Sequence, residues 1–302
     1  MNPWTPLAGA TLGWAAGSVL TRAVLVRGVS TWTLIPLRML FALVSLGAVI
    51  AISKRFWTTN PSAWKRGLSL GTVAMAIPMV FMTLAFEDLP VSLGGLLVAL
   101  IPLATIAAAH FFVPGERFQL KTLPGLLLAL LGSALLVGVG GGSIQGVGNL
   151  GRGVLFMMIG VLMAGIGGAL SRRFALELSS NDLVLPQFTV NTVVVAVVLP
   201  LVFGFDVGSV DAVSWLLLAG IGVLGTTLSF GSFLMAAGLN PATRLALVSY
   251  AIPVLSVVLA VIFLGEHVTL GIGAGAVLIL AGVILAERST VHVPEPGVAT
   301  AR

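Results

Sequence analysis

Residues 92–112 read SLGGLLVALIPLATIAAAHFF. His110 is the one ionisable side chain in this stretch. A helix of about 20 apolar residues is long enough to cross the hydrocarbon core of a bilayer. A helix that is apolar on all sides is also what a lipid environment demands. The stretch therefore predicts a membrane-spanning helix and decides how the rest of the chain is interpreted.

Nine further apolar runs of similar length lie on either side of this stretch. Charged or turn-forming residues such as Lys54-Arg55, Asn60-Pro61 and Glu87-Asp88 separate them. The pattern lacks the alternating strands of about ten residues that build membrane β-barrels. The predicted fold class is an all-α integral membrane protein with ten transmembrane helices. The expected spans are 6–26, 33–53, 67–86, 92–112, 120–140, 153–172, 183–203, 215–237, 244–263 and 270–287.

The composition supports this interpretation and excludes several classes of protein. Hydrophobic residues make up 58% of the 302 residues and charged residues 8%, against about 25% charged residues in soluble domains. A globule of this length cannot cover its surface with ten acids and fifteen bases. A soluble enzyme, a nucleic-acid-binding protein and a disordered protein are therefore excluded. Because the chain has no cysteine, it has no thiolate metal site or redox centre, and we expect neither a metal nor a cofactor.

The basic residues predict the orientation in the membrane. Cytoplasmic loops carry an excess of Lys and Arg. With the N-terminus in the cytoplasm, eleven basic residues fall in inner loops and the tail, whereas Arg22, Arg27 and Arg152 fall outside. We therefore expect both termini in the cytoplasm. The first run is longer than a signal-peptide core of roughly 7–15 residues, and it counts as a true span.

The two halves of the chain align on each other at an offset of 150 or 151 residues. Each half holds five spans, an odd number, so the second half enters the membrane from the opposite side. The expected units are residues 1–145 and 146–290, two inverted five-helix repeats (5+5), and a cytoplasmic tail, 291–302. Inverted repeats allow alternating access to a site between them near the midplane, which predicts a transporter. Matching positions include Arg22 and Arg172, Ile101-Pro102 and Ile252-Pro253, and Gly115-Glu116 and Gly265-Glu266.

The motifs of each half also resemble a known family. Gly13-Trp14 in the first span, Arg38 in the second, a proline midway along the fourth and Gly-Glu before a glycine-spaced fifth are similar to the EamA-type repeat. Two such repeats resemble the drug/metabolite transporter superfamily over nearly the whole chain, and within it the YddG-type exporters of aromatic and other amino acids. The resemblance implies a cavity lined by spans one to four and six to nine, with the fifth and tenth outside. Pro114 departs from the pattern, since the second half has Leu264 there.

Arg38 is the clearest candidate for a functional charge within the membrane. An ionisable side chain costs about 2.5–3.5 kcal/mol there on insertion scales. The guanidinium either holds a substrate carboxylate or serves the structure by binding carbonyls or snorkelling outward; the sequence leaves both open. None of the ten acids lies in a membrane core. His110 is expected at the cytoplasmic interface, so the sequence favours uniport over proton coupling.

Further polar, aromatic and methionine side chains are candidates for lining the cavity. Methionine adapts to ligands of varied shape. Serine and threonine also permit close helix packing, which is the favoured interpretation for any one of them. Gln187 and Asn191 are costlier to bury in lipid, which favours a cavity role. The candidate cavity residues are Trp14, Ser18, Arg38, Met79, Thr83, Gln187, Asn191, Thr226, Ser229, Phe230 and Tyr250.

Three prolines are candidate hinges. Pro78, Pro102 and Pro253 interrupt spans three, four and nine, where each removes a backbone donor and frees a carbonyl. We expect hinges at these positions, with a static kink as the alternative. Glu116 and Glu266 are expected to begin spans five and ten, because a carboxylate is favoured at the positive end of a helix.

Together these features predict an alternating-access exporter of small metabolites, in the first place aromatic or neutral amino acids, that works as a uniporter in a bacterial inner membrane. A proton-coupled exporter of drugs or toxic compounds is one alternative and requires pH-dependent flux. A polytopic membrane enzyme acting on a lipid is another, but three histidines and no cysteine give it little chemistry. The expected partners are a small-molecule substrate and the lipid bilayer, without nucleic acid, and a monomer is the expected oligomeric state.

Overall fold

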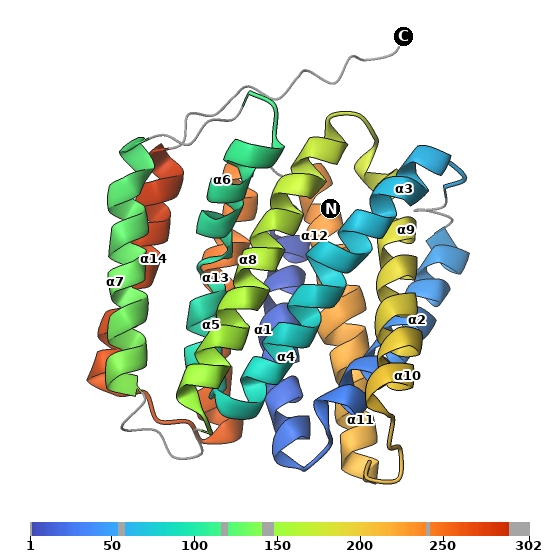
Figure 1. The fold of residues 1–302 in the computed structure, drawn as a ribbon, viewed down its shortest axis with the longest axis horizontal. Helices are drawn as coiled ribbons and strands as arrows, with labels where there is room; N and C mark the ends of the chain where they lie inside the picture. The colour runs from blue at the N-terminus through green and yellow to red at the C-terminus, as the bar shows by residue number, and fades with distance from the viewer. Residues whose placement is uncertain (1, 54–57, 116–119, 141–147, 240–241, 290–302) are drawn as a thin grey trace.

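The computed structural model describes residues 2–53, 58–115, 120–140, 148–239 and 242–289. Within these ranges all regular structure is helical. Helices that continue one another form rods, which run side by side along the bundle (Figure 1). Each of the ten expected spans coincides with one rod in the described part of the chain. The prediction of an all-helical fold is therefore confirmed.

The first five rods come from residues 4–140. The third is longer than expected, because Asn60 caps its start by accepting a hydrogen bond from the Ser62 amide. The helix bounds are α1 Trp4–Val26; α2 Thr31–Ser53; α3 Pro61–Ser69, η1 Leu70–Ala76 and α4 Ile77–Asp88; α5 Val91–Val98 and α6 Ile101–Phe112; and η2 Leu120–Thr122 and α7 Leu123–Gly140.

The other five rods come from residues 150–289. The helix bounds are α8 Leu150–Ala175; α9 Ser180–Val193, η3 Val194–Val198 and α10 Leu199–Phe203; α11 Ala212–Gly220, η4 Ile221–Leu228 and α12 Ser229–Leu239; α13 Ala242–Leu264; and α14 Leu270–Ser289. Three segments, η1, η3 and η4, are π-helices, and η1 and η4 lie at matching places in the two halves.

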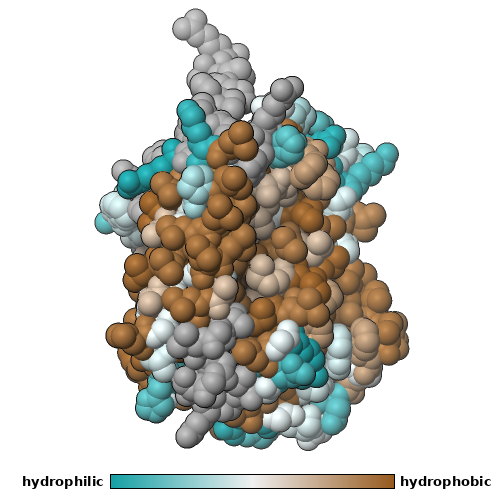
Figure 2. All heavy atoms as spheres, turned by 60° about the vertical axis from the view of Figure 1, so that its left-hand side comes forward, coloured by the Kyte–Doolittle hydropathy of each residue, from teal (hydrophilic) through white to brown (hydrophobic). Residues whose placement is uncertain are grey.

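The surface has the polarity of a membrane protein. Seven described helices are long and apolar enough to cross a bilayer, and three shorter apolar ones are Leu120–Leu135, Tyr250–Leu264 and Leu270–Ala286. On the face that Figure 2 shows, hydrophobic side chains form a broad band across the middle, and hydrophilic ones gather toward the two ends. Leu201 and Leu216 are 82% and 74% exposed. Apolar exposure on this scale needs a nonaqueous surrounding, so the chain is a multi-pass membrane protein.

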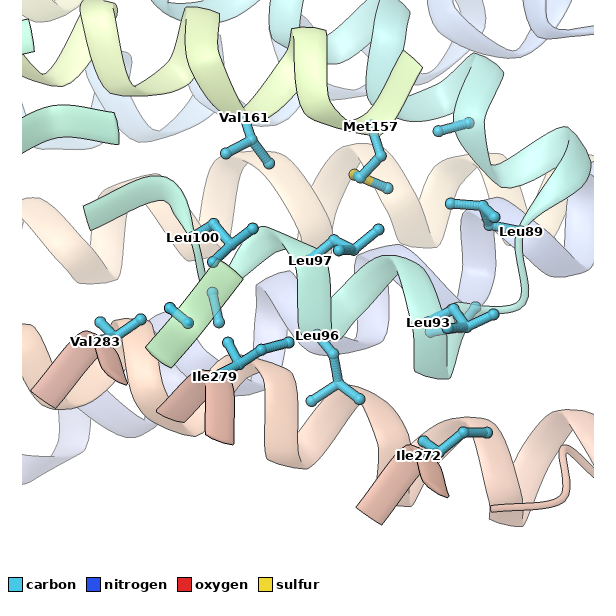
Figure 3. Close-up of a cluster of buried hydrophobic side chains, with 14 of the residues drawn as sticks. Leu89, Leu93, Leu96, Leu97, Leu100, Met157, Val161, Ile272, Ile279 and Val283 are labelled. Carbon is cyan, nitrogen blue, oxygen red and sulfur yellow. The ribbon is translucent and has the colours of Figure 1, made fainter. Parts of the chain in front are cut away.

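The helices of one half pack mainly on helices of the other. Helix α1 contacts η4, α12 and α13, and α8 makes the matching contacts with η1, α4 and α6. Helices α7 and α14 lie side by side at one edge of the bundle (Figure 1). Helix α5 lies between α8 and α14, with Leu97 near Met157 on one side and Leu96 toward Ile279 on the other (Figure 3).

Small residues allow helix α1 to cross η4, and helix α8 to cross η1, at close range. These two contacts are called the crossings. A Cβ atom on Gly17 of α1 would lie 2.9 Å from Cα of Gly225 in η4. A Cβ atom on Gly167 of α8 would lie 2.4 Å from Cα of Ala74 in η1. Backbones approach this closely only where no side chain intervenes, as is common between membrane helices. Both crossings therefore depend on glycine.

Gly17→Ala tests the first crossing. The added methyl group meets backbone rather than a movable side chain, so we expect the free energy of unfolding in detergent to fall by about 1–3 kcal/mol. Gly47→Ala is the matched control, because a Cβ atom there meets nothing within 4 Å. It is expected to be neutral or slightly stabilising. Equal effects of the two substitutions on the unfolding midpoint would contradict the close crossing.

Candidate substrate cavity

A cavity of about 400 Å³ lies among the rods. Its lining comes from α1, α2, η1, α4, α5, α6, α8, η4, α12 and α13. The described side chains of α7 and α14 do not line the cavity, which agrees with the expectation that the fifth and tenth spans lie outside. The described residues of α9, η3 and α10 do not line it either, although the resemblance implies that the seventh span lines the cavity. Helix α9 packs against α3 and η1, and its Phe188 lies behind the lining ring of Phe230. The cavity is thus built where the α1–η4 and α8–η1 crossings come together.

Most of the residues predicted from sequence line this one cavity. They come from four rods of the first half and one of the second, although up to 216 positions separate them in the chain. Their side chains are aromatic, thioether, hydroxyl or guanidinium groups, so the wall is mainly apolar with a few polar points. The predicted residues in the wall are Trp14, Ser18, Arg38, Pro78, Met79, Thr83, Pro102, Thr226 and Phe230.

Five predicted residues are not in the wall: Gln187, Asn191, Ser229, Tyr250 and Pro253. Asn191 is fully buried and its amide lies 3.6 Å from the Met39 sulfur. Ser229 donates a hydrogen bond of 2.6 Å to the Leu224 carbonyl within its own rod. Tyr250 packs at the margin of the core around α5. Gln187 belongs to α9, which packs outside η1.

The three candidate hinges differ in their local structure. Between α5 and α6 the helix is interrupted at Ala99 and Leu100, and Pro102 lies in the first turn of α6. Pro78 lies in the first turn of α4, directly after the π-helix η1. Pro253 lies inside the continuous helix α13. The two halves therefore differ at the paired positions Pro102 and Pro253, and the hinge role stays a prediction.

Arg38 supplies the charge of the cavity wall. Its Nη2 donates a hydrogen bond of 3.2 Å to Oγ1 of Thr226. That threonine in turn donates its own hydroxyl to the Ile221 carbonyl of η4. The Nε atom of Arg38 is buried and has no hydrogen-bond partner in the described structure. A buried donor of this kind is ordinarily satisfied, so the guanidinium retains capacity for a further acceptor.

Aromatic and methionine side chains form the apolar part of the wall. The ring of Trp14 lies edge-on to Phe230 at 5.3 Å and is tilted against Phe233 at 5.4 Å. Met75, Met79 and Met82 line the wall from the third rod. Such a surface suits an amphipathic ligand, because flexible thioethers adapt to its shape.

Sequence reasoning missed several of these residues. Phe233 repeats the face of Thr226 and Phe230 at helical spacing, and this periodicity was the available signal. Met82 stands one turn beyond Pro78 in the same way. The lining by Val248 and Ile252 has no comparable signal, since these residues are indistinguishable from lipid-facing ones in α13.

Polar groups tie the helices together at one end of the bundle. Arg22 donates hydrogen bonds to the carbonyls of Phe86 and Glu87 at the end of α4, at 2.6 and 2.9 Å. Glu266 accepts from the amides of Val91 and Ser92, at 2.7 and 2.9 Å. It therefore caps the start of α5 rather than the tenth span, so the expected helix for this carboxylate was wrong. Glu116, its counterpart, lies outside the described residues.

Two ion pairs belong to the same end. Asp88, with 4% of its side chain exposed, holds Arg152 at 2.6 Å and also accepts from the Asn149 amide. Arg27 and Asp211 form the second pair and join the loop after α1 to the start of α11. The hydrogen bond from Arg27, helped by Ser214, holds the pKa of Asp211 below its usual range. These two ion pairs and the cap of Glu266 on α5 connect the first half of the chain to the second.

Apolar rods around a central amphipathic cavity define a multi-pass membrane transporter. The model of the EamA-like transporter family matches residues 7–138 and again residues 151–288. The chain belongs to this family, within the drug/metabolite transporter superfamily. One match lies in each half of the chain.

Relatives carry the same general description. A protein of Archaeoglobus fulgidus described as an uncharacterized transporter is 23% identical over 95% of this chain and 99% of its own length. The uncharacterized transporter YvbV of Bacillus subtilis is 26% identical over 69% of this chain and 67% of its own. One crystal structure shares the fold with a TM-score of 0.61 at 21% identity, over 92% of this chain and 96% of that one.

The Asp88–Arg152 pair predicts an asymmetry between two substitutions. Arg152→Gln leaves a buried carboxylate without its cation, and we expect it to lower the free energy of unfolding by about 1–3 kcal/mol. Asp88→Asn frees an arginine that is 52% exposed and is hydrated by water, so its cost is about 1 kcal/mol or less. Unfolding of both variants and the double variant in detergent measures this. A larger loss for Asp88→Asn would contradict the assignment.

Proposed function

We propose that this transporter exports small amphipathic metabolites, in the first place aromatic or neutral amino acids, by alternating access as a uniporter. The observation that carries the proposal is the cavity of about 400 Å³ lined by aromatic, thioether and hydroxyl groups and one guanidinium. Small-molecule sites have volumes of roughly 300–1,000 Å³, so the cavity suits one such solute. The choice of amino acids rests on the resemblance to YddG-type exporters.

Alternating access follows from a proposed inverted repeat of residues 1–145 and 146–290. Two family matches, one in each half, support it. So do the matching crossings, where α1 meets η4 and α8 meets η1. A solute site between two such halves opens to one side or the other as they rock. In this proposal Pro78 and Pro102 serve as hinges, since the backbone is irregular directly before each.

The orientation and membrane are part of the proposal. We propose that both termini and the tail, 291–302, lie in the cytoplasm, which the excess of basic residues on one side supports. The linked end that contains Arg22, Asp88 and Glu266 is then the outer end. We propose a bacterial inner membrane as the location and a monomer as the working unit, since one chain supplies the whole cavity wall.

Uniport is supported by the chemistry of the wall. Its residues, all in the described ranges, include no aspartate, glutamate or histidine. A side chain that binds and releases protons near neutral pH is the usual basis of proton coupling in membrane carriers. His110 is the titratable side chain that the sequence offers for proton coupling. It lies in the last turn of α6 and is not among the lining residues.

Flux measurements test the proposal. Proteoliposomes loaded with radiolabelled phenylalanine, leucine or tryptophan are expected to release the amino acid faster than liposomes without protein. The rate of release is expected to be the same with and without a pH gradient. Ala164→Trp fills the cavity wall and is expected to abolish release. Ala51→Trp places the same side chain on an exposed position of α2 and is expected to leave it unchanged.

Three other outcomes are informative. Release that depends on a proton gradient would replace uniport by proton coupling and make His110→Gln the next variant. Release of lipophilic cations but not amino acids would favour the drug exporter. Hydrolysis or transfer of a labelled lipid without solute release would favour the membrane enzyme.

A further inference from the structure

Among the described residues that line the cavity, Arg38 is the one with a charged side chain. Its contact with Thr226 does not neutralise it, because the threonine oxygen is an uncharged acceptor whose own proton goes to the Ile221 carbonyl. Arg38 takes part in no ion pair among the described residues. Its Nε atom is buried and unpartnered beside this contact. A planar guanidinium with free donors is matched best by a carboxylate, which accepts two parallel hydrogen bonds.

The acids nearest in sequence to the lining helices are engaged elsewhere. Glu87 accepts a hydrogen bond from Thr31, Asp88 pairs with Arg152, and Glu266 caps α5. These contacts hold the carboxylates at the end of the bundle rather than in the wall. The cavity wall therefore carries one positive charge that no described lining residue balances.

A positive charge on a ligand finds no carboxylate among the described lining residues. An ammonium group in this cavity meets aromatic rings such as Trp14 and Phe230, methionine sulfurs and hydroxyls, together with the repulsion of Arg38. Rings attract cations only weakly compared with a carboxylate at hydrogen-bond distance. An apolar body, in contrast, packs well against the same rings and thioethers.

We infer that the cavity selects small monocarboxylates with an apolar body, whose carboxylate binds Arg38, over zwitterions and cations of the same shape. This inference rests on the proposed transport site and sharpens its substrate class. Phenylalanine and similar amino acids still bind, because their carboxylate reaches Arg38, but their ammonium group loses water without gaining an anionic partner. Organic acids that lack the ammonium group bind more tightly.

Three ligands on one skeleton test the inference: 3-phenylpropionate, phenylalanine and phenethylamine. They share the phenyl ring and two-carbon chain and differ in their charged groups alone. Calorimetric titration of the full-length protein in nanodiscs is expected to give affinities at least tenfold apart, in the order 3-phenylpropionate, phenylalanine, phenethylamine. Arg38→Gln is expected to weaken 3-phenylpropionate at least tenfold and to leave phenethylamine unchanged or tighter. Arg38→Lys, which keeps the charge but loses the planar donor pair, is expected to be intermediate.

The control is Arg173→Gln, which makes the same change of charge at an exposed position in the last turn of α8. It is expected to leave all three affinities as in the wild type. Equal wild-type affinities for the three ligands would overturn the inference, and this comparison needs no variant to fold. An equal loss for all three in a folded Arg38→Gln protein would also overturn it, because Arg38 would then serve the structure.

The inference and the proposed function fail in different ways. Tight, Arg38-dependent binding of 3-phenylpropionate without movement of any solute through liposomes would contradict transport and leave the carboxylate site standing. Export of amino acids with no preference for the carboxylate, and with no selective effect of Arg38→Gln, would contradict the site and leave transport standing.

Discussion

Lipid offers no hydrogen bonds to the backbone, and this constraint shapes the whole molecule. Every amide and carbonyl in the hydrocarbon must be satisfied within its own helix or by neighbouring protein. Two of the three π-helices, η1 and η4, contribute residues to the cavity wall, and the interruption at Ala99 and Leu100 lies between the lining residues Val98 and Ile101. The third π-helix, η3, contributes none among the described residues. Thr226 and Ser229 donate hydroxyl hydrogen bonds to carbonyls of η4 that a regular α-helix would have used. The irregular backbone of η1, of η4 and of the interruption between α5 and α6 therefore lies beside the cavity.

The same environment governs the charged groups. At the ends of the bundle they find partners, as in the pairs Asp88–Arg152 and Arg27–Asp211, and these links join the two halves. Arg38 is the exception, since the described residues of the wall around it include no acid. A charge at membrane depth is retained where it serves a function. In the proposed transport cycle, Arg38 holds the carboxylate of the solute, and the polar links join the two halves at one end of the bundle.

The sequence predicts the helices well and the site in part. Hydropathy depends on composition alone, so the spans could be read directly from runs such as 92–112. Trp14, Arg38 and Phe230 were found as polar or aromatic exceptions in apolar helices, and they line the cavity. The same reasoning also selected Asn191, which does not line the cavity. Sequence cannot distinguish the two cases, because a buried amide can contact either a cavity or a neighbouring side chain such as Met39. The cap that Glu266 places on α5 joins residues 175 positions apart, and no local pattern reveals it.

Distances across the two ends of the bundle test alternating access most directly. Because the chain has no cysteine, spin labels attach only where cysteines are introduced. One pair replaces the exposed Val26 and Val207, and the other replaces the exposed Trp64 and Leu176 at the opposite end. Pulsed electron spin resonance on the reconstituted protein is expected to show two distances for each pair, with substrate widening one end as it narrows the other. A single distance at each end, unchanged by substrate, would contradict the account.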